Sequence, residues 1–101
     1  MVYKIIWSPL AIRSYVSNIE YLETAWTKNE TVKFVSAVEN KISLLKIHPK
    51  VGKLTAKRLN LRQTAIHKRI ILIYRIKPLK NEVELVRFFN TYQSPRRLKK
   101  K

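Results

Sequence analysis

The side chains in this sequence that could do chemistry are overwhelmingly cations. Lysine and arginine number 22 against six glutamates, there is no aspartate, and the formal charge at pH 7 is +16. No acidic residue occurs between Glu39 and Glu82, a stretch that holds twelve lysines and arginines. Like charges at this density repel one another unless an anion lies nearby. The charge therefore predicts an anionic partner, nucleic acid first, with an acidic protein or a membrane surface as alternatives. The plainer interpretation is a solubilising surface.

Other kinds of site find little support in the residue types. The chain has no cysteine, which excludes disulfides, thiolate metal sites and cysteine nucleophiles. Two histidines without any aspartate make no metal-ligand cluster, and a single glycine cannot build a glycine-rich phosphate loop. Glu82 and Glu84 share one strand face, a spacing that is common by chance. We therefore expect neither a metal nor a cofactor.

Seven cations are the best candidates for contacts with a target or with nucleic acid. Four fall within ten residues of one another, on a predicted loop and the strand after it. One lies at the start of a later strand, and two belong to the basic tail, residues 96–101, for which a flexible end is the alternative interpretation. The seven are Lys53, Lys57, Arg58, Arg62, Arg69, Arg96 and Arg97.

Two helices are predicted in the first half of the chain, after a short strand at residues 2–7. Ser8 and Pro9 are typical of a helix start, and the first helix should span about 9–24. Thr27 and Glu30 form a capping-box pattern that opens a second helix, which should end near residue 47, before Pro49. The short link predicts an antiparallel hairpin. The expected apolar stripe of the first helix is Ile12, Tyr15, Val16, Ile19 and Leu22.

The second half of the chain is predicted to be β-rich. Residues 49–58 indicate a loop, and strands are expected at about 60–66, 69–77 and 82–89, with turns at 67–68 and 78–81. The order β-α-α-β-β-β predicts one α+β domain over residues 1–101. Its helical hairpin should cover one face of a mainly antiparallel four-stranded sheet and leave the other face partly bare. Trp7 and Trp26 are expected in the core, and Tyr74 and Phe89 in the core or on the sheet face.

The chain carries no pattern that would send it into or across a membrane. The opening MVYKIIWSPL has too short an apolar stretch for a secretory signal. No apolar run approaches the roughly 18 residues needed to span a bilayer. We therefore expect a cytoplasmic protein.

Five short motifs, in order, carry a family resemblance over nearly the whole chain. They are Trp7-Ser8-Pro9-x-Ala11, then Tyr21-Leu22 ahead of Trp26, then Ile42-x-x-Leu45-x-x-x-Pro49-x-x-Gly52, then Leu61-Arg62 with Ile73-Tyr74-Arg75-Ile76, and finally Val86-x-x-Phe89-x-x-x-Gln93-x-Pro95. With this element order, size and charge, the chain resembles the RelE/ParE superfamily of toxins from type II toxin–antitoxin systems. Its motifs lie closer to the ParE-like members than to the nucleases.

The resemblance implies a partner and a choice of targets. Such toxins are held inactive by a cognate antitoxin with an acidic, foldable segment, and they meet operator DNA only through that antitoxin. ParE-like members bind and poison DNA gyrase without cutting nucleic acid. RelE-like members are ribosome-dependent endoribonucleases that cut messenger RNA, without a metal. Whether this chain is an enzyme is therefore open at this point.

The nuclease chemistry implied by the resemblance needs a base, an acid and a cation around the scissile phosphate. Two family positions for cations hold Ile71 and Tyr92 here, and the late catalytic tyrosine would fall near Leu98. These departures favour gyrase poisoning over RNA cleavage. His67 is otherwise a turn residue, and Tyr92 a packing residue at the sheet edge. The substitutes for catalysis, if there is any, are Tyr92, Arg62, Arg87 and His67.

Overall fold

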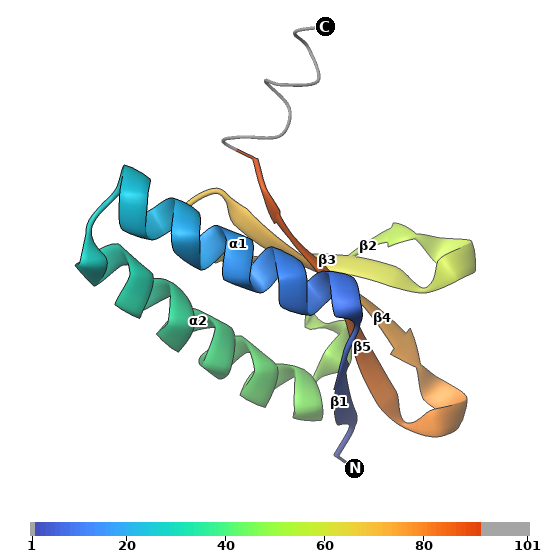
Figure 1. The fold of residues 1–101 in the computed structure, drawn as a ribbon. Helices are drawn as coiled ribbons and strands as arrows, with labels where there is room; N and C mark the ends of the chain where they lie inside the picture. The colour runs from blue at the N-terminus through green and yellow to red at the C-terminus, as the bar shows by residue number, and fades with distance from the viewer. Residues whose placement is uncertain (1, 92–101) are drawn as a thin grey trace, which may run out of the picture.

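Two helices and a five-stranded sheet make up the computed structural model, which describes residues 2–91. β1 (Lys4–Trp7) is followed by α1 (Pro9–Ala25), α2 (Lys28–Ile47), β2 (Lys53–Ala56), β3 (Leu61–His67), β4 (Ile70–Lys77) and β5 (Glu82–Asn90). The strands lie in the order β1-β5-β4-β3-β2, with the helical hairpin on one face (Figure 1). β1 runs parallel to β5, and every other neighbouring pair is antiparallel. The predicted α+β architecture is thus confirmed.

The sheet has five strands where the sequence predicted four. The extra strand, β2, lies inside the segment predicted as a loop, between short 3-10 turns at Pro49–Val51 and Lys57–Leu59. Its residues, KLTA, are mostly exposed and show little apolar alternation. β2 forms because β3 offers a free edge: Lys53 pairs with Gln63 and Leu54 with Arg62, with a register shift before Ala56. β2 thus depends on pairing with its neighbouring strand, which the sequence pattern of residues 53–56 alone does not predict.

Both helices begin where their caps predict. The Ser8 hydroxyl accepts a hydrogen bond from the Ala11 backbone N–H at 3.0 Å, and the Thr27 hydroxyl accepts from that of Glu30 at 3.3 Å. The second half of the predicted capping box does not form in the expected way. The Glu30 carboxylate instead contacts His67, 2.8 Å away at the end of β3.

An aromatic cluster ties four elements together in the core. Trp7 of β1 stacks on Phe88 of β5 with ring centroids 5.7 Å apart and meets Tyr15 of α1 edge-on at 5.3 Å. Phe34 of α2 contacts Tyr15 at 5.6 Å and Phe88 at 6.1 Å. Aromatic pairs at these separations add to the free energy of burial. Trp7 is the expected core residue, whereas Trp26 is 36% exposed at the end of α1, so the core prediction for Trp26 was wrong.

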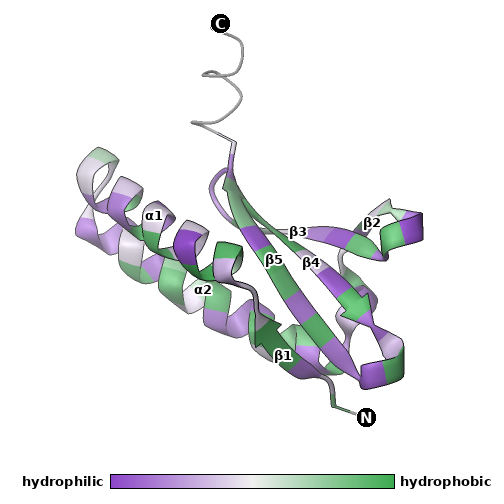
Figure 2. Ribbon diagram, turned by 45° about the vertical axis from the view of Figure 1, so that its right-hand side comes forward, coloured by the Kyte–Doolittle hydropathy of each residue, from purple (hydrophilic) through white to green (hydrophobic). Residues whose placement is uncertain are grey.

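The sheet has one covered face and one open face. Along β4, Leu72, Tyr74 and Ile76 are buried under the helices, while Ile71 and the alternate residues after it are half-buried on the other side. Figure 2 shows bands of hydrophobic and hydrophilic residues along β5, whereas β4 begins with four apolar residues, so its first half is apolar on both faces. We call the side that carries Ile71, Ile73, Arg75, Arg87 and Phe89 the open face. The bare second face predicted from the sequence is therefore present.

A polar seam joins α1 to β5 where β1 has ended. The Ser8 hydroxyl donates to the Val86 carbonyl at 2.9 Å, the Phe88 N–H donates to the Ser14 hydroxyl at 2.9 Å, and the Asn18 amide donates to the Phe88 carbonyl at 3.3 Å. β5 has no β1 partner beyond the Trp7–Leu85 pair, so these side chains satisfy backbone groups that would otherwise lack partners.

The apolar stripe predicted for α1 was partly wrong, because polar residues of the seam take the buried positions. Ser14 and Asn18 are buried, whereas Ile12 and Val16 are 52% and 47% exposed. The helix is rotated so that its hydrogen-bonding side chains, rather than these two aliphatic ones, meet β5. Within residues 2–91, no helix is both long enough and apolar enough to cross a membrane.

Candidate functional site

Side chains from β2 to β5 line up in rows across the open face. One row runs Lys53, Gln63, Ile73 and Arg87, because each is the register partner of the next. A second row runs Ala65, Ile71 and Phe89. Ala65, Ile71, Ile73 and Phe89 therefore form an apolar shelf within the open face, and the first row has a cation at each end.

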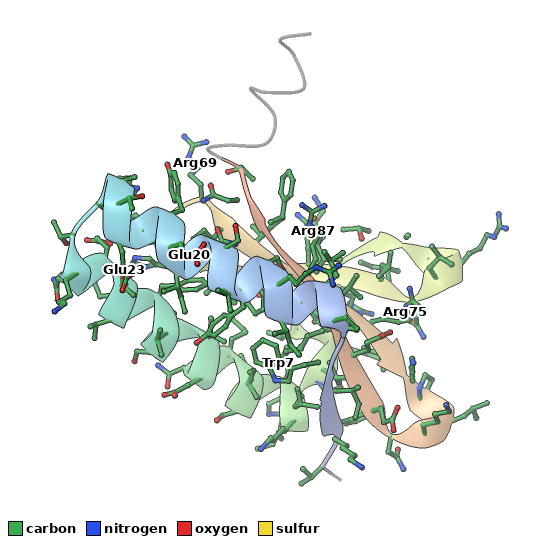
Figure 3. All side chains as sticks on the ribbon, in the orientation of Figure 1. Trp7, Glu20, Glu23, Arg69, Arg75 and Arg87 are labelled. Atoms are coloured by element: carbon green, nitrogen blue, oxygen red, sulfur yellow. The ribbon has the colours of Figure 1, made fainter. Side chains whose placement is uncertain are left out.

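A β-bulge sets the position of Arg87. Ile73 pairs with Arg87 and Tyr74 with Leu85, so Val86 is the extra residue. Bulges re-aim side chains and are common beside functional sites. The Arg87 guanidinium lies 5.1 Å from the centroid of the Phe89 ring, a cation–π distance, and it has no ion pair within the described part of the chain. Figure 3 shows Arg87 and Arg75 on the side of the sheet away from α2.

The other cations of the open face are partly neutralised. Glu84 of β5 lies 3.9 Å from the Arg75 guanidinium and 3.6 Å from the Lys77 ammonium group. These pairs are about one third exposed on their cationic side, so each contributes little to stability. Because Arg75 and Lys77 share Glu84 and Arg87 has no ion pair within the described residues, Arg87 is the cation of β4 and β5 best placed to bind an external anion.

Arg62, a candidate from the sequence, faces the helical side of the sheet instead. Its register partner is the buried Tyr74, and its guanidinium donates to the Gly52 carbonyl at 2.8 Å and the Lys50 carbonyl at 3.3 Å. Tyr74 donates to the Pro49 carbonyl at 2.6 Å and accepts from the Gly52 N–H at 2.9 Å. Burial raises the pKa of Tyr74, against smaller lowering effects from Gly52 and Arg62. Arg62 and Tyr74 thus hold the segment before β2 in place.

His67, a second candidate, is tied to α2. Its Nε2 lies 2.8 Å from Glu30 Oε1, and both side chains are only 15% exposed. Lys68, in a left-handed conformation at φ 54°, places its ammonium group 3.8 Å from Glu30 and 4.9 Å from the Trp26 ring. The hydrogen bond from His67, helped by Lys68, outweighs partial desolvation and lowers the pKa of Glu30. The histidine therefore closes the helical hairpin onto the β3–β4 turn rather than joining Arg87.

Three of the predicted binding cations lie on the hairpin of β2 and β3, Lys53 at the start of β2 and the other two on the turn after it. Lys53, Lys57 and Arg58 are exposed and have no ion pair within residues 2–91. We call them the basic ridge. The turn at Lys57–Leu59 also lines an open hollow of about 450 Å³. Lys53 belongs both to the ridge and to the first row of the open face.

Arg69, another predicted binding cation, is not part of the ridge. Arg69 (labelled in Figure 3) is exposed at the β3–β4 turn, at the opposite end of β3 from Lys57 and Arg58, and its carbonyl accepts from Thr91. Seven residues of β3 separate the two ends by about 20 Å. Tyr92, Arg96 and Arg97 lie outside the described residues.

The described part of the open face offers an arginine and apolar side chains for contact with a partner. The open face has Arg87 as an available cation, but Ile71 and Phe89 beside it cannot transfer protons. Residues 2–91 contain no cluster of three or more potential metal-ligating side chains. The polar seam and the bulge at Val86 were not found from the sequence, because buried serine and asparagine in a helix and one extra strand residue leave no periodic pattern.

Comparisons with known proteins agree with this geometry. A family model described as the ParE toxin of type II toxin–antitoxin systems, parDE, matches residues 5–95. The solved structure of a "Chromosomal ParDE TA system from P. aeruginosa" has a similar fold, with 11% sequence identity and a TM-score of 0.70. That match covers 88% of this chain and 96% of the other. No curated protein matches at a significant level.

Proposed function

The chain belongs to the ParE toxin family, and from that premise we propose that it arrests growth by binding and poisoning DNA gyrase, in the cytoplasm, with no catalysis of its own. The observation that carries the proposal is the apolar shelf of the open face. Ile71 and Phe89 occupy its centre, where cleavage of RNA would call for cations and proton-transfer groups. A half-buried apolar shelf beside an arginine at cation–π distance from an aromatic ring is better suited to contact with another protein than to binding a scissile phosphate.

The same surface supports control by an acidic antitoxin. A family member of this kind has an antitoxin partner, and the strong positive charge of this chain favours an acidic one. An antitoxin segment that places an apolar side chain on Ile73 and a carboxylate on Arg87 would cover the shelf. Competition for one face would then explain how the antitoxin keeps the toxin from its target.

Inducing the toxin without its antitoxin tests the mode of action. We expect DNA synthesis to stop first, while translated messages stay intact, and purified gyrase to lose supercoiling activity in the presence of the toxin. Pulse labelling of DNA and protein, primer extension on abundant messages and a supercoiling assay measure these outcomes. Cuts at defined codon positions in translated messages, with DNA synthesis continuing, would show the ribosome-dependent endoribonuclease instead.

Two variants separate binding from catalysis. Tyr92→Phe keeps the ring and removes the hydroxyl, so toxicity should persist if no proton is transferred there. Phe89→Ser removes the ring of the shelf that supports Arg87, and we expect gyrase inhibition to need about tenfold more toxin, typical for one interface anchor. Ile12→Ser, which changes an exposed aliphatic side chain on α1, is the matched control. Equal effects of Phe89→Ser and Ile12→Ser would exclude the shelf as the binding surface.

A further inference from the structure

We infer that the basic ridge, Lys53, Lys57 and Arg58, binds the phosphate backbone of duplex DNA. The inference rests on the proposed function in one respect, because the DNA concerned is the duplex that the poisoned topoisomerase holds. The toxin would then contact two components of one complex: the enzyme through the open face and the DNA through the ridge. Of the ridge residues, only Lys53 also borders the open face, whereas Lys57 and Arg58 lie on the turn beyond β2.

The positive charge of the ridge is not compensated by an ion pair within the described residues. Glu30 and Glu84 are the only carboxylates in ion pairs within residues 2–91, and neither pairs with a ridge residue. The acid-free stretch between Glu39 and Glu82 contains the whole hairpin. Phosphates supply the missing counter-charge, and their neutralisation releases condensed counterions from the DNA.

The local structure supports contact with a backbone rather than with bases. Residues 50–60 contain no aromatic side chain, so the ridge has no platform on which an unpaired base could stack. Arg58 and Lys57 lie on a short 3-10 turn that projects between β2 and β3 and lines the open hollow beside it. The turn ends at Asn60, whose left-handed backbone (φ 57°) and side-chain hydrogen bond to the Ile76 carbonyl, 3.1 Å long, fix it to β4. A fixed, projecting pair of cations is suited to duplex phosphates.

Matched triple variants test the ridge against the general charge of the protein. The ridge triple is Lys53→Gln, Lys57→Gln and Arg58→Gln. The control triple is Arg13→Gln, Lys28→Gln and Lys33→Gln, which removes two lysines and one arginine from exposed positions on the helical hairpin. Binding of the antitoxin-free toxin to a fluorescent 20-base-pair duplex is followed by anisotropy at several salt concentrations. A single-stranded RNA of equal length is measured in parallel.

We expect the ridge triple to weaken duplex binding about tenfold and to reduce the slope of log K against log salt by about 2 to 3. The control triple should change affinity by less than about twofold. Equal losses in the two triples, or a larger ridge effect on the RNA than on the duplex, would overturn the inference. Gyrase inhibition by the ridge triple is measured separately. If wild-type toxin fails to inhibit gyrase, the proposed function falls, while the anisotropy still decides whether the ridge binds DNA.

Discussion

At the scale of single residues, the only glycine in the chain is required by a close approach. A Cβ built on Gly52 would lie 2.5 Å from the Tyr74 hydroxyl oxygen and 2.8 Å from the Gln63 carbonyl oxygen. Neither atom can easily retreat, because Tyr74 is fully buried and the carbonyl belongs to β3. The family motif that ends in Gly52 thus has a packing cause: it lets the segment before β2 lie against the tyrosine hydroxyl.

Removing that hydroxyl should measurably destabilise the fold. Tyr74→Phe leaves the Pro49 carbonyl and the Gly52 N–H without their partner, which should cost about 1–3 kcal/mol in the free energy of unfolding. Urea denaturation at pH 7 measures it. The raised pKa of Tyr74 adds a pH signature. The Tyr74 hydroxyl keeps its proton to a higher pH in the native state than in the unfolded chain. Its contribution to the free energy of unfolding is therefore present below pH about 10 and is lost as the pH rises above that value. A Tyr74→Phe protein with undiminished stability at pH 7 would contradict the network.

The Glu30–His67 contact should make part of the stability sensitive to acid. The pKa of Glu30 is lowered from its ordinary value of 4.5, chiefly by the hydrogen bond to His67. The contribution of Glu30 to the free energy of unfolding is therefore present above pH about 4.5 and is lost as the pH falls through its lowered native pKa. Glu30→Gln should lower the melting temperature at pH 6 and flatten the pH dependence below 5. Glu23→Gln, at an exposed position on α1, is the control in thermal melts from pH 3 to 7. Identical pH profiles for the two variants would rule out the contact as the cause.

At the scale of elements, local patterns predicted the helices well because helix caps are local. Ser8 and Thr27 each accept a hydrogen bond from the residue three positions later, so the spacing in the sequence predicts where each helix starts. β4 was also predicted, because its isoleucines and tyrosine strongly favour a strand. β2 and the orientation of α1 were not, because both depend on partners far along the chain. The candidate residues followed the same division. Lys53, Lys57 and Arg58 could be grouped because they are close in sequence, whereas the contacts of Arg62 and His67 could not be predicted because their partners are distant carbonyls and a carboxylate.

The seam between α1 and β5 allows a closely matched test of that orientation. Ser14→Ala removes the acceptor of the buried Phe88 N–H, and we expect a loss of about 1–3 kcal/mol. Ser17→Ala changes the same residue type at an exposed position three residues later in the same helix, and should shift stability by less than about 0.5 kcal/mol. Urea denaturation of both variants gives the comparison. Losses of equal size would mean that α1 is not held to β5 by this seam.

At the scale of the whole molecule, charge is divided unequally between the two layers. Residues 8–48, the helical layer, carry five cations and four glutamates, whereas residues 49–91 carry eleven cations and two glutamates. The open face and the basic ridge both belong to the second group. A target approaching the sheet side therefore meets most of the field of residues 2–91, which favours fast association with anionic partners. The bare face of the sheet and the excess of cations thus belong to the same layer of the molecule.

The same asymmetry predicts that salt stabilises the free protein, mainly by screening repulsion among the cations of residues 49–91. Repulsion among eleven cations opposes the compact state, and added salt screens it over about 10 Å at 0.1 M. Raising NaCl from 20 to 500 mM should raise the melting temperature by about 5 °C, equivalent to roughly 1 kcal/mol. The pair Lys57→Gln and Arg58→Gln should reduce this salt effect more than the pair Lys28→Gln and Arg13→Gln, because the second pair lies in the nearly balanced helical layer. Differential scanning calorimetry across the salt series measures all three proteins. A melting temperature independent of salt would show that the charge of the sheet side is already compensated within the chain.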